Sequence, residues 1–189
     1  MTAVQPLTIL VSEHRLIEQV IAALEVKAET LGEQPFAREF FEGALDFLSN
    51  FAARCHLAKE EERLFPLLWE KGVPLENGPL GASMSEHEAG RRQLEAIRLH
   101  FAAAEQGSPE ALAAIRSLVR DFARFARQHI RKEEQRLFNV AWTLLESSDI
   151  KRLQRDFEEV ELEYPETTFH RRYEALAEHL AAAALVRPR

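Results

Sequence analysis

The sequence is poor in cysteine and in the residues that interrupt helices. Cys55 is the single cysteine of the 189-residue chain, so no internal disulfide can form, in agreement with a reducing compartment. Seven glycines and eight prolines lie mostly between long stretches rich in Ala, Leu, Glu and Arg. Runs of β-branched residues are rare as well, so the composition predicts an all-α protein without a sheet.

An excess of positive charge is also missing. The net charge is −7, whereas a nucleic-acid footprint requires clustered Lys and Arg. The N-terminal "MTAVQPLTILVSEH" has no cationic segment, and its apolar run breaks at Ser12, which is typical of neither a signal peptide nor a membrane span. We therefore expect a cytoplasmic protein that binds neither nucleic acid nor a membrane.

Glycine and proline divide the chain into four long helical segments and a tail. We expect helices over residues 7–31, 36–72, 82–106 and 109–146, the last with Ser108 as its N-cap and Pro109 as its first residue. Pro66 should kink or end the second helix. Four long helices with short connections predict an up-down-up-down four-helix bundle over residues 1–146. Residues 147–189 should form a short helical extension packed on or next to it.

One stretch of the sequence occurs twice. "HLAKEEERLFPLLW" at residues 56–69 returns as "HIRKEEQRLFNVAW" at residues 129–142, with eight of fourteen positions identical and an offset of 73. His14 and His87, each in a "SEH" motif, have the same offset. The first two helices therefore look like a duplicate of the last two, related by an approximate two-fold axis along the bundle.

Each copy of the repeat places a histidine and a glutamate on one helix face. His56 and Glu60, like His129 and Glu133, are four residues apart, which is one helical turn. Both pairs lie among apolar residues, and burial of such groups without partners costs several kcal/mol. Either the histidines pair with the carboxylates alone, or a pair of metal ions binds all of them, as carboxylate-bridged sites in helical bundles do.

Four motifs in this order resemble the hemerythrin-like family, also called HHE cation-binding proteins: "SEHRLIEQ", "RCHLAKEEERLFPLL", "GPLGASMSEHEAGR" and "RQHIRKEEQRLF". The resemblance covers about residues 7–145, and the tail is similar to the C-terminal extension of one bacterial branch. It implies two non-haem iron ions with an oxo or hydroxo bridge. It also implies that His14, His56, His87 and His129 are terminal ligands. Glu60 and Glu133 would be the bridging carboxylates. The ligand types admit manganese or zinc as well.

The sequence departs from the oxygen-carrying members of that family. Arg91 stands where those proteins have a fifth histidine, and Leu57 stands where many members have a second histidine. The remaining set resembles that of bacterial iron-centre repair proteins, although those usually carry an additional cysteine-containing domain. The resemblance implies binding, sensing or reduction of dioxygen, peroxide or nitric oxide, with a peroxidase-like or catalase-like reaction as the enzymatic version. The alternative is a non-enzymatic module for iron storage, donation or repair; the electron donor and a homodimeric state stay open.

Neighbours of these residues have simpler interpretations. Glu61 and Glu134 should either be solvated or contact a metal ligand without binding the metal. Glu13 and Glu86 either orient an imidazole or face solvent. Lys59 and Lys132 are expected at the surface, and the repeated Phe and Trp residues in the core. Cys55 should be a small core residue, and His170 would be a ligand only if the tail folded over the bundle.

Overall fold

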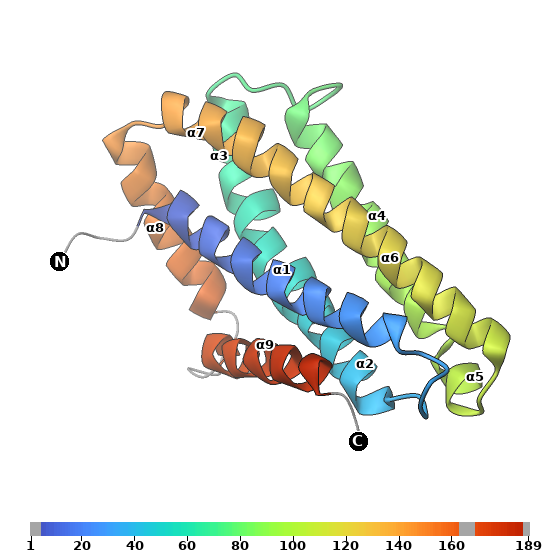
Figure 1. The fold of residues 1–189 in the computed structure, drawn as a ribbon. Helices are drawn as coiled ribbons and strands as arrows, with labels where there is room; N and C mark the ends of the chain where they lie inside the picture. Colours follow the sequence, from blue (N-terminus) through green and yellow to red (C-terminus); the bar gives the residue numbers. More distant parts are fainter. Residues whose placement is uncertain (1–4, 163–168, 187–189) are drawn as a thin grey trace.

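The computed structural model describes residues 5–162 and 169–186 as helices joined by short turns, without a β-strand in these ranges. Four antiparallel rods form the bundle (Figure 1). The first rod is α1 (Pro6–Glu29), and the second joins α2 (Arg38–Asp46), η1 (Phe47–His56), η2 (Lys59–Leu64) and α3 (Phe65–Glu70). The third contains α4 (Pro79–Arg98) and α5 (Phe101–Glu105), and the fourth joins α6 (Pro109–Lys132), η3 (Glu133–Leu137) and α7 (Phe138–Leu144).

Each rod packs against two neighbours, as an up-down-up-down bundle requires. Helix α1 packs against α6 and η1, and α4 packs against the same two elements. The prediction of an all-α bundle is thus confirmed. The third helix begins three residues earlier than expected because Pro79 occupies the first helical turn, and it breaks at Leu99 and His100 before α5.

Helix ends follow the local chemistry of the sequence. Ser108 is the N-cap of α6, and its Oγ accepts a hydrogen bond from the backbone N–H of Ala111 at 3.2 Å. Gly72 ends α3 with φ +92°, a left-handed conformation that glycine adopts without strain. Pro66 does not end the second rod, because it lies in the first turn of α3, where its missing N–H is tolerated.

The tail lies along one side of the bundle. Helix α8 (Ser147–Leu162) packs against η2 and α1, and α9 (Phe169–Leu185) packs against α1, α2 and η1. Both run beside the first and second rods in Figure 1. Phe157 of α8 and Tyr173 of α9 are buried in these contacts. The sequence also predicts a break between two tail helices at "YPETT", residues 164–168, which lie outside the described residues.

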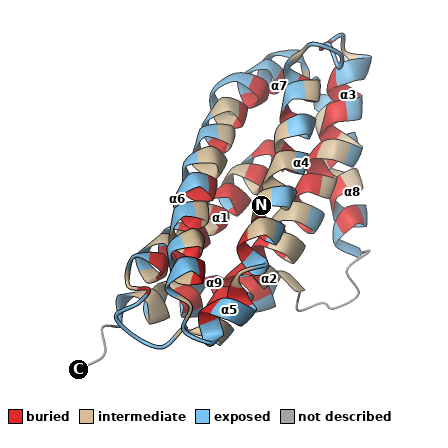
Figure 2. Cartoon of the chain, turned by 90° about the vertical axis from the view of Figure 1, so that its right-hand side faces the viewer, coloured by how far each residue is buried: buried red, intermediate tan, exposed pale blue. Residues whose placement is uncertain are grey.

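The apolar core is divided into two clusters with a polar layer between them. Helix α1 shows this directly: Leu10 belongs to one cluster, Ile17 belongs to the other, and the buried His14 lies between them. The rods turn their buried faces inward along their whole length (Figure 2). The two clusters hold the helices at fixed spacing on both sides of the polar layer.

Two expectations about burial were wrong. Trp69 is 62% exposed and Trp142 is 47% exposed, because both lie off the buried stripe of their rods. Leu68 and Ala141 lie on that stripe, and each tryptophan follows one residue later, about 100° around the helix. The aromatic residues at 65 and 138 are buried as predicted.

Adjacent substitutions in α3 test this arrangement. Leu68→Ala should lower the free energy of unfolding by about 2–5 kcal/mol, because Leu68 is fully buried. Trp69→Ala should change it by less than about 1 kcal/mol, because most of the side chain is already in water. Urea unfolding in the presence of a chelator measures both. A loss at position 69 as large as at position 68 would contradict the structure.

Candidate metal centre

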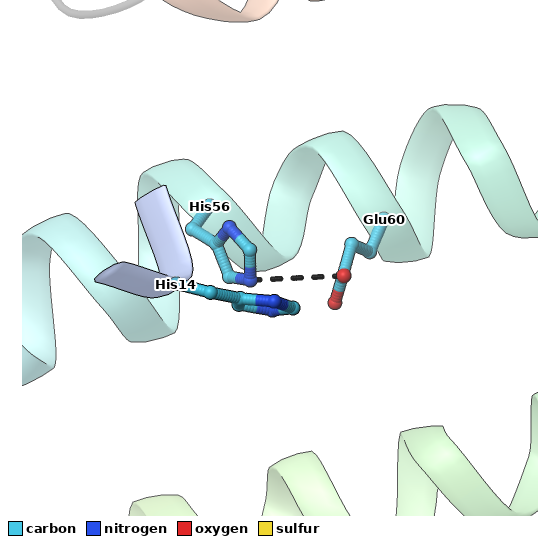
Figure 3. A group of neighbouring side chains, drawn as sticks. All are labelled: His14, His56 and Glu60. Atoms are coloured by element: carbon cyan, nitrogen blue, oxygen red, sulfur yellow. Dashed lines mark ion pairs between the residues drawn. The ribbon is translucent and has the colours of Figure 1, made fainter. Parts of the chain in front are cut away.

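The polar layer consists of the six side chains that the sequence singled out. All six are buried or nearly so. They form two groups, and within each group the donor atoms lie within 4.8 Å of one another. The first group, from the first and second rods, consists of His14, His56 and Glu60. The second group, from the third and fourth rods, consists of His87, His129 and Glu133. Figure 3 shows the first group, with the His56 ring and the Glu60 carboxylate on the same face of the rod.

Both carboxylates reach from one group to the other. Glu60 has Oε1 3.7 Å from His56 Nε2 and Oε2 3.4 Å from His87 Nε2. Glu133 has Oε2 3.5 Å from His14 Nε2 and 3.2 Å from His129 Nε2. Two donors bound to one ion at about 2.1 Å each lie roughly 3–4 Å apart. The donor spacing is therefore that of a coordination sphere, with each glutamate between two groups of histidines.

A second set of carboxylates holds the opposite edge of each imidazole. Four glutamates lie within hydrogen-bond distance of the four histidine Nδ1 atoms: Glu13 to His56 at 2.9 Å, Glu61 to His87 at 2.7 Å, Glu86 to His129 at 2.9 Å and Glu134 to His14 at 3.1 Å. Each rod thereby holds a histidine of a neighbouring rod. The sequence left open whether these glutamates were solvated, and the structure shows that all four contact an imidazole.

These hydrogen bonds determine which ring nitrogen is free. A carboxylate only accepts, so each Nδ1 donates its proton, and in a neutral imidazole the lone pair is then on Nε2. His87 differs from the other three, because its Nε2 also has hydrogen-bond geometry with Glu133 Oε1, at 3.2 Å. The Nε2 atoms face Glu60 and Glu133, as described above. Burial lowers the pKa of His56 to about 4 and also lowers that of His129. For His87, burial acts in the same direction, but hydrogen bonds to Glu133 and Glu61 outweigh it and raise the pKa.

Both bridging candidates lie in π-helical turns. Glu60 belongs to η2 and Glu133 is the first residue of η3, where the backbone hydrogen bonds span one residue more than in an α-helix. Such turns are rare and are frequent at functional sites. The repeat therefore preserves a backbone irregularity as well as the side chains.

The buried polar atoms test whether this layer suits a cation. His14 Nε2, both oxygens of Glu60 and Oε2 of Glu133 are buried without a hydrogen-bond partner. Burial and the nearby Glu133 raise the pKa of Glu60 well above its usual value. Burial alone would also raise the pKa of Glu133, but the neighbouring His14, His87 and His129 outweigh it and lower the pKa. Nitrogen and oxygen donors with unused lone pairs beside buried negative charge fit metal cations.

Lys59 was expected at the surface, and this was wrong. Its side chain is 0% exposed, and its ammonium group donates to Glu13 Oε1 and to Glu161 Oε1. Helix α8 covers it and supplies Glu161. Lys132, at the equivalent position of the repeat, is 40% exposed as expected and donates to Glu86.

The remaining candidates from the sequence lie outside the six-residue layer. Cys55 is buried, and burial raises the pKa of its thiol to about 12, so it is not a reactive thiolate. His170 approaches Cys55 Sγ at 3.7 Å and Glu161 Oε1 at 3.5 Å. It does not contact the described carboxylates of Glu60 or Glu133.

A small apolar cavity adjoins all four histidines. It has a volume of about 80 Å³, and several of its lining residues form pairs that the 73-residue repeat relates, such as Ala53 with Ala126 and Ile17 with Gly90. Arg91 lines it as well and donates to Glu61 at 2.9 Å. This space could not be predicted from the sequence, because it depends on where residues of all four rods meet.

Comparison with known proteins supplies the family. The model of the Hemerythrin HHE cation binding domain matches residues 5–141, a range that contains all six side chains of the polar layer. Searches of the curated proteins and of the solved structures each gave no significant match. None of the described helices is long and apolar enough to cross a membrane. By its family model and its helical bundle, the chain belongs to the hemerythrin family, with an HHE cation-binding domain over residues 5–141.

Proposed function

We propose that the protein binds two iron ions in the polar layer and uses them to bind, sense or reduce a small oxidant. The observation that carries this proposal is the convergence of four imidazole Nε2 atoms on two buried carboxylates with unpartnered oxygens. Each half-site offers two imidazoles: His14 and His56 in the first, His87 and His129 in the second. Glu60 and Glu133 would be shared, because each reaches histidines of both half-sites.

Iron fits this donor set better than the hard cations. Imidazole nitrogen favours transition metals over magnesium and calcium, and mixed imidazole and carboxylate sets with positions left for other ligands are typical of non-haem iron. When bound there, two adjacent iron ions would supply electrons to a small oxidant. The protein's own contribution is to hold the imidazoles by their Nδ1 hydrogen bonds and to keep the surroundings apolar.

The cavity limits the ligand to a small molecule. A volume of about 80 Å³ with apolar walls is far below the roughly 300–1,000 Å³ of pockets for organic ligands. Dioxygen, nitric oxide and hydrogen peroxide are small enough to enter it. Because the cavity lies beside all four histidines, such a ligand would lie next to both half-sites.

Iron content tests the centre. The purified wild type should contain about two iron atoms per chain, and the double variant His56→Ala, His129→Ala should contain far fewer, because each half-site loses an imidazole. Inductively coupled plasma mass spectrometry measures this. The double variant His100→Ala, His179→Ala, which changes histidines outside the layer, should keep the wild-type content. Metal-free wild type that takes up no iron under anaerobic conditions would refute the centre.

The buried carboxylates should destabilise the metal-free protein. Glu60→Met should raise the free energy of unfolding in a chelator by about 1–4 kcal/mol, since an apolar side chain replaces a buried carboxyl group without partners. The same variant should bind less than half the wild-type iron. Chemical denaturation with and without iron measures both effects. A variant less stable than the metal-free wild type would show that Glu60 is satisfied without metal.

Filling the cavity should hinder the oxidant without removing the metal. Ala126→Leu adds an isopropyl group to the cavity wall and should slow oxidation of the ferrous protein by hydrogen peroxide about tenfold, or about 1.4 kcal/mol in the barrier. Ala102→Leu, at an exposed position, is the matched control. Stopped-flow absorbance at equal iron content measures the rates. Equal rates in both variants would show that the cavity is not the route.

A further inference from the structure

The repeat relates the ligands of the two half-sites, but the surroundings of the glutamates that hold His56 and His129 differ. In the first half-site, His56 Nδ1 donates to Glu13, and Lys59 donates to the other oxygen of that carboxylate. In the second, His129 donates to Glu86 and Lys132 donates to Glu86 in the same way. The same series of contacts, from histidine to glutamate to lysine, thus occurs twice at the offset of 73 residues.

In the part of the chain that the structure describes, the tail contacts only the first of these two series of contacts. Glu161, near the end of α8, accepts a hydrogen bond from Lys59 Nζ at 2.9 Å. His170, near the start of α9, has Nε2 3.5 Å from the same carboxylate oxygen. Contacts therefore run without a gap from both tail helices through Lys59 and Glu13 to His56. Among the described residues, Lys132 has an ion pair with Glu86 and no tail partner.

The side chains of the first series of contacts are more deeply buried than those of the second. Lys59 is 0% exposed and Glu13 is 5% exposed, whereas Lys132 is 40% exposed and Glu86 is 24% exposed. Ion pairs in contact with water are weakened by solvent and salt, and buried pairs much less so. Glu13 is therefore held in one orientation more firmly than Glu86, and the same follows for the imidazole that each one holds.

The group Glu13, Glu161 and His170 could be read as a third cation site by its donor types. Lys59 argues against this, because its ammonium group already lies against both carboxylates and would repel a cation. The cluster is better explained as a support for His56.

We infer that Lys59 and Glu161 are positioning residues, through which the tail makes the half-site of His14 and His56 the tighter of the two iron sites. This inference rests on the proposed function, since it concerns the affinity of the same centre. Partners that orient a metal-binding histidine typically contribute 10–100-fold to metal affinity. The first iron should accordingly enter this half-site, and the second iron should enter the more exposed one.

Stepwise binding of ferrous iron to the full chain tests the inference. Anaerobic titration with a competing chelator should resolve two steps in the wild type, one tighter than the other. Glu161→Gln keeps the size of a partly exposed side chain and removes its charge, so it should weaken the tighter step about tenfold and leave the other unchanged. The thermal midpoint of the metal-free variant should match that of the wild type, which separates positioning from a general loss of stability.

The repeat supplies matched controls. Lys59→Met should weaken the tighter step by about 10–100-fold, whereas Lys132→Met should weaken the other step by less than about threefold, because that ion pair is exposed to solvent. Lys59→Arg, which keeps the charge, should recover part of the affinity. His87→Ala leaves the first half-site, where Glu161→Gln should still weaken binding. His14→Ala leaves the second half-site, where Glu161→Gln should have no effect.

The outcomes are distinguishable from a failure of the proposed function. Wild type that binds no iron would refute the centre itself. Two iron ions that bind with equal affinity, or equal losses in Lys59→Met and Lys132→Met, would overturn the inference while leaving the centre intact. An effect of Glu161→Gln in the His14→Ala background as large as in the His87→Ala background would overturn it as well.

Discussion

Two buried carboxylates in the middle of an apolar bundle impose the constraint on which this structure depends. Glu60 and Glu133 are at most 1% exposed, and three of their four oxygens have no hydrogen-bond partner. Burial of polar groups without hydrogen-bond partners costs several kcal/mol. The two apolar clusters on either side of the layer supply the stability that tolerates this cost. The bundle therefore presents negative charge and nitrogen lone pairs to a site between its four rods.

The imidazoles are oriented by a closed set of contacts between the rods. Each histidine is held through Nδ1 by a glutamate of a neighbouring rod, so every rod contributes both to the layer and to the orientation of the next one. This arrangement explains why the sequence repeats "SEH" and "KEE" rather than the ligating positions alone. The π-helical turns at Glu60 and Glu133 add the local backbone geometry at which the carboxylates enter.

Much of the fold and of the layer could be predicted because one pattern encodes both. The offset of 73 identified the hairpin repeat, and the spacing of four placed His56 with Glu60 and His129 with Glu133 on single faces. Features that depend on how distant segments pack could not be predicted. Lys59 is buried only because α8 covers it, and its equivalent Lys132 is exposed, so identical local sequence produced two environments. The burial predicted for Trp69 and Trp142 was wrong for a related reason, since the repeat does not show which of its apolar positions face the core.

The central claim is that the two half-sites form one dinuclear centre through shared carboxylates, and X-ray absorption at the iron edge tests it most directly. The protein loaded with two equivalents of iron should show nitrogen and oxygen neighbours, together with an iron–iron scattering path at roughly 3–4 Å. Iron with nitrogen and oxygen neighbours but no second iron within that range would contradict the claim and indicate two independent sites.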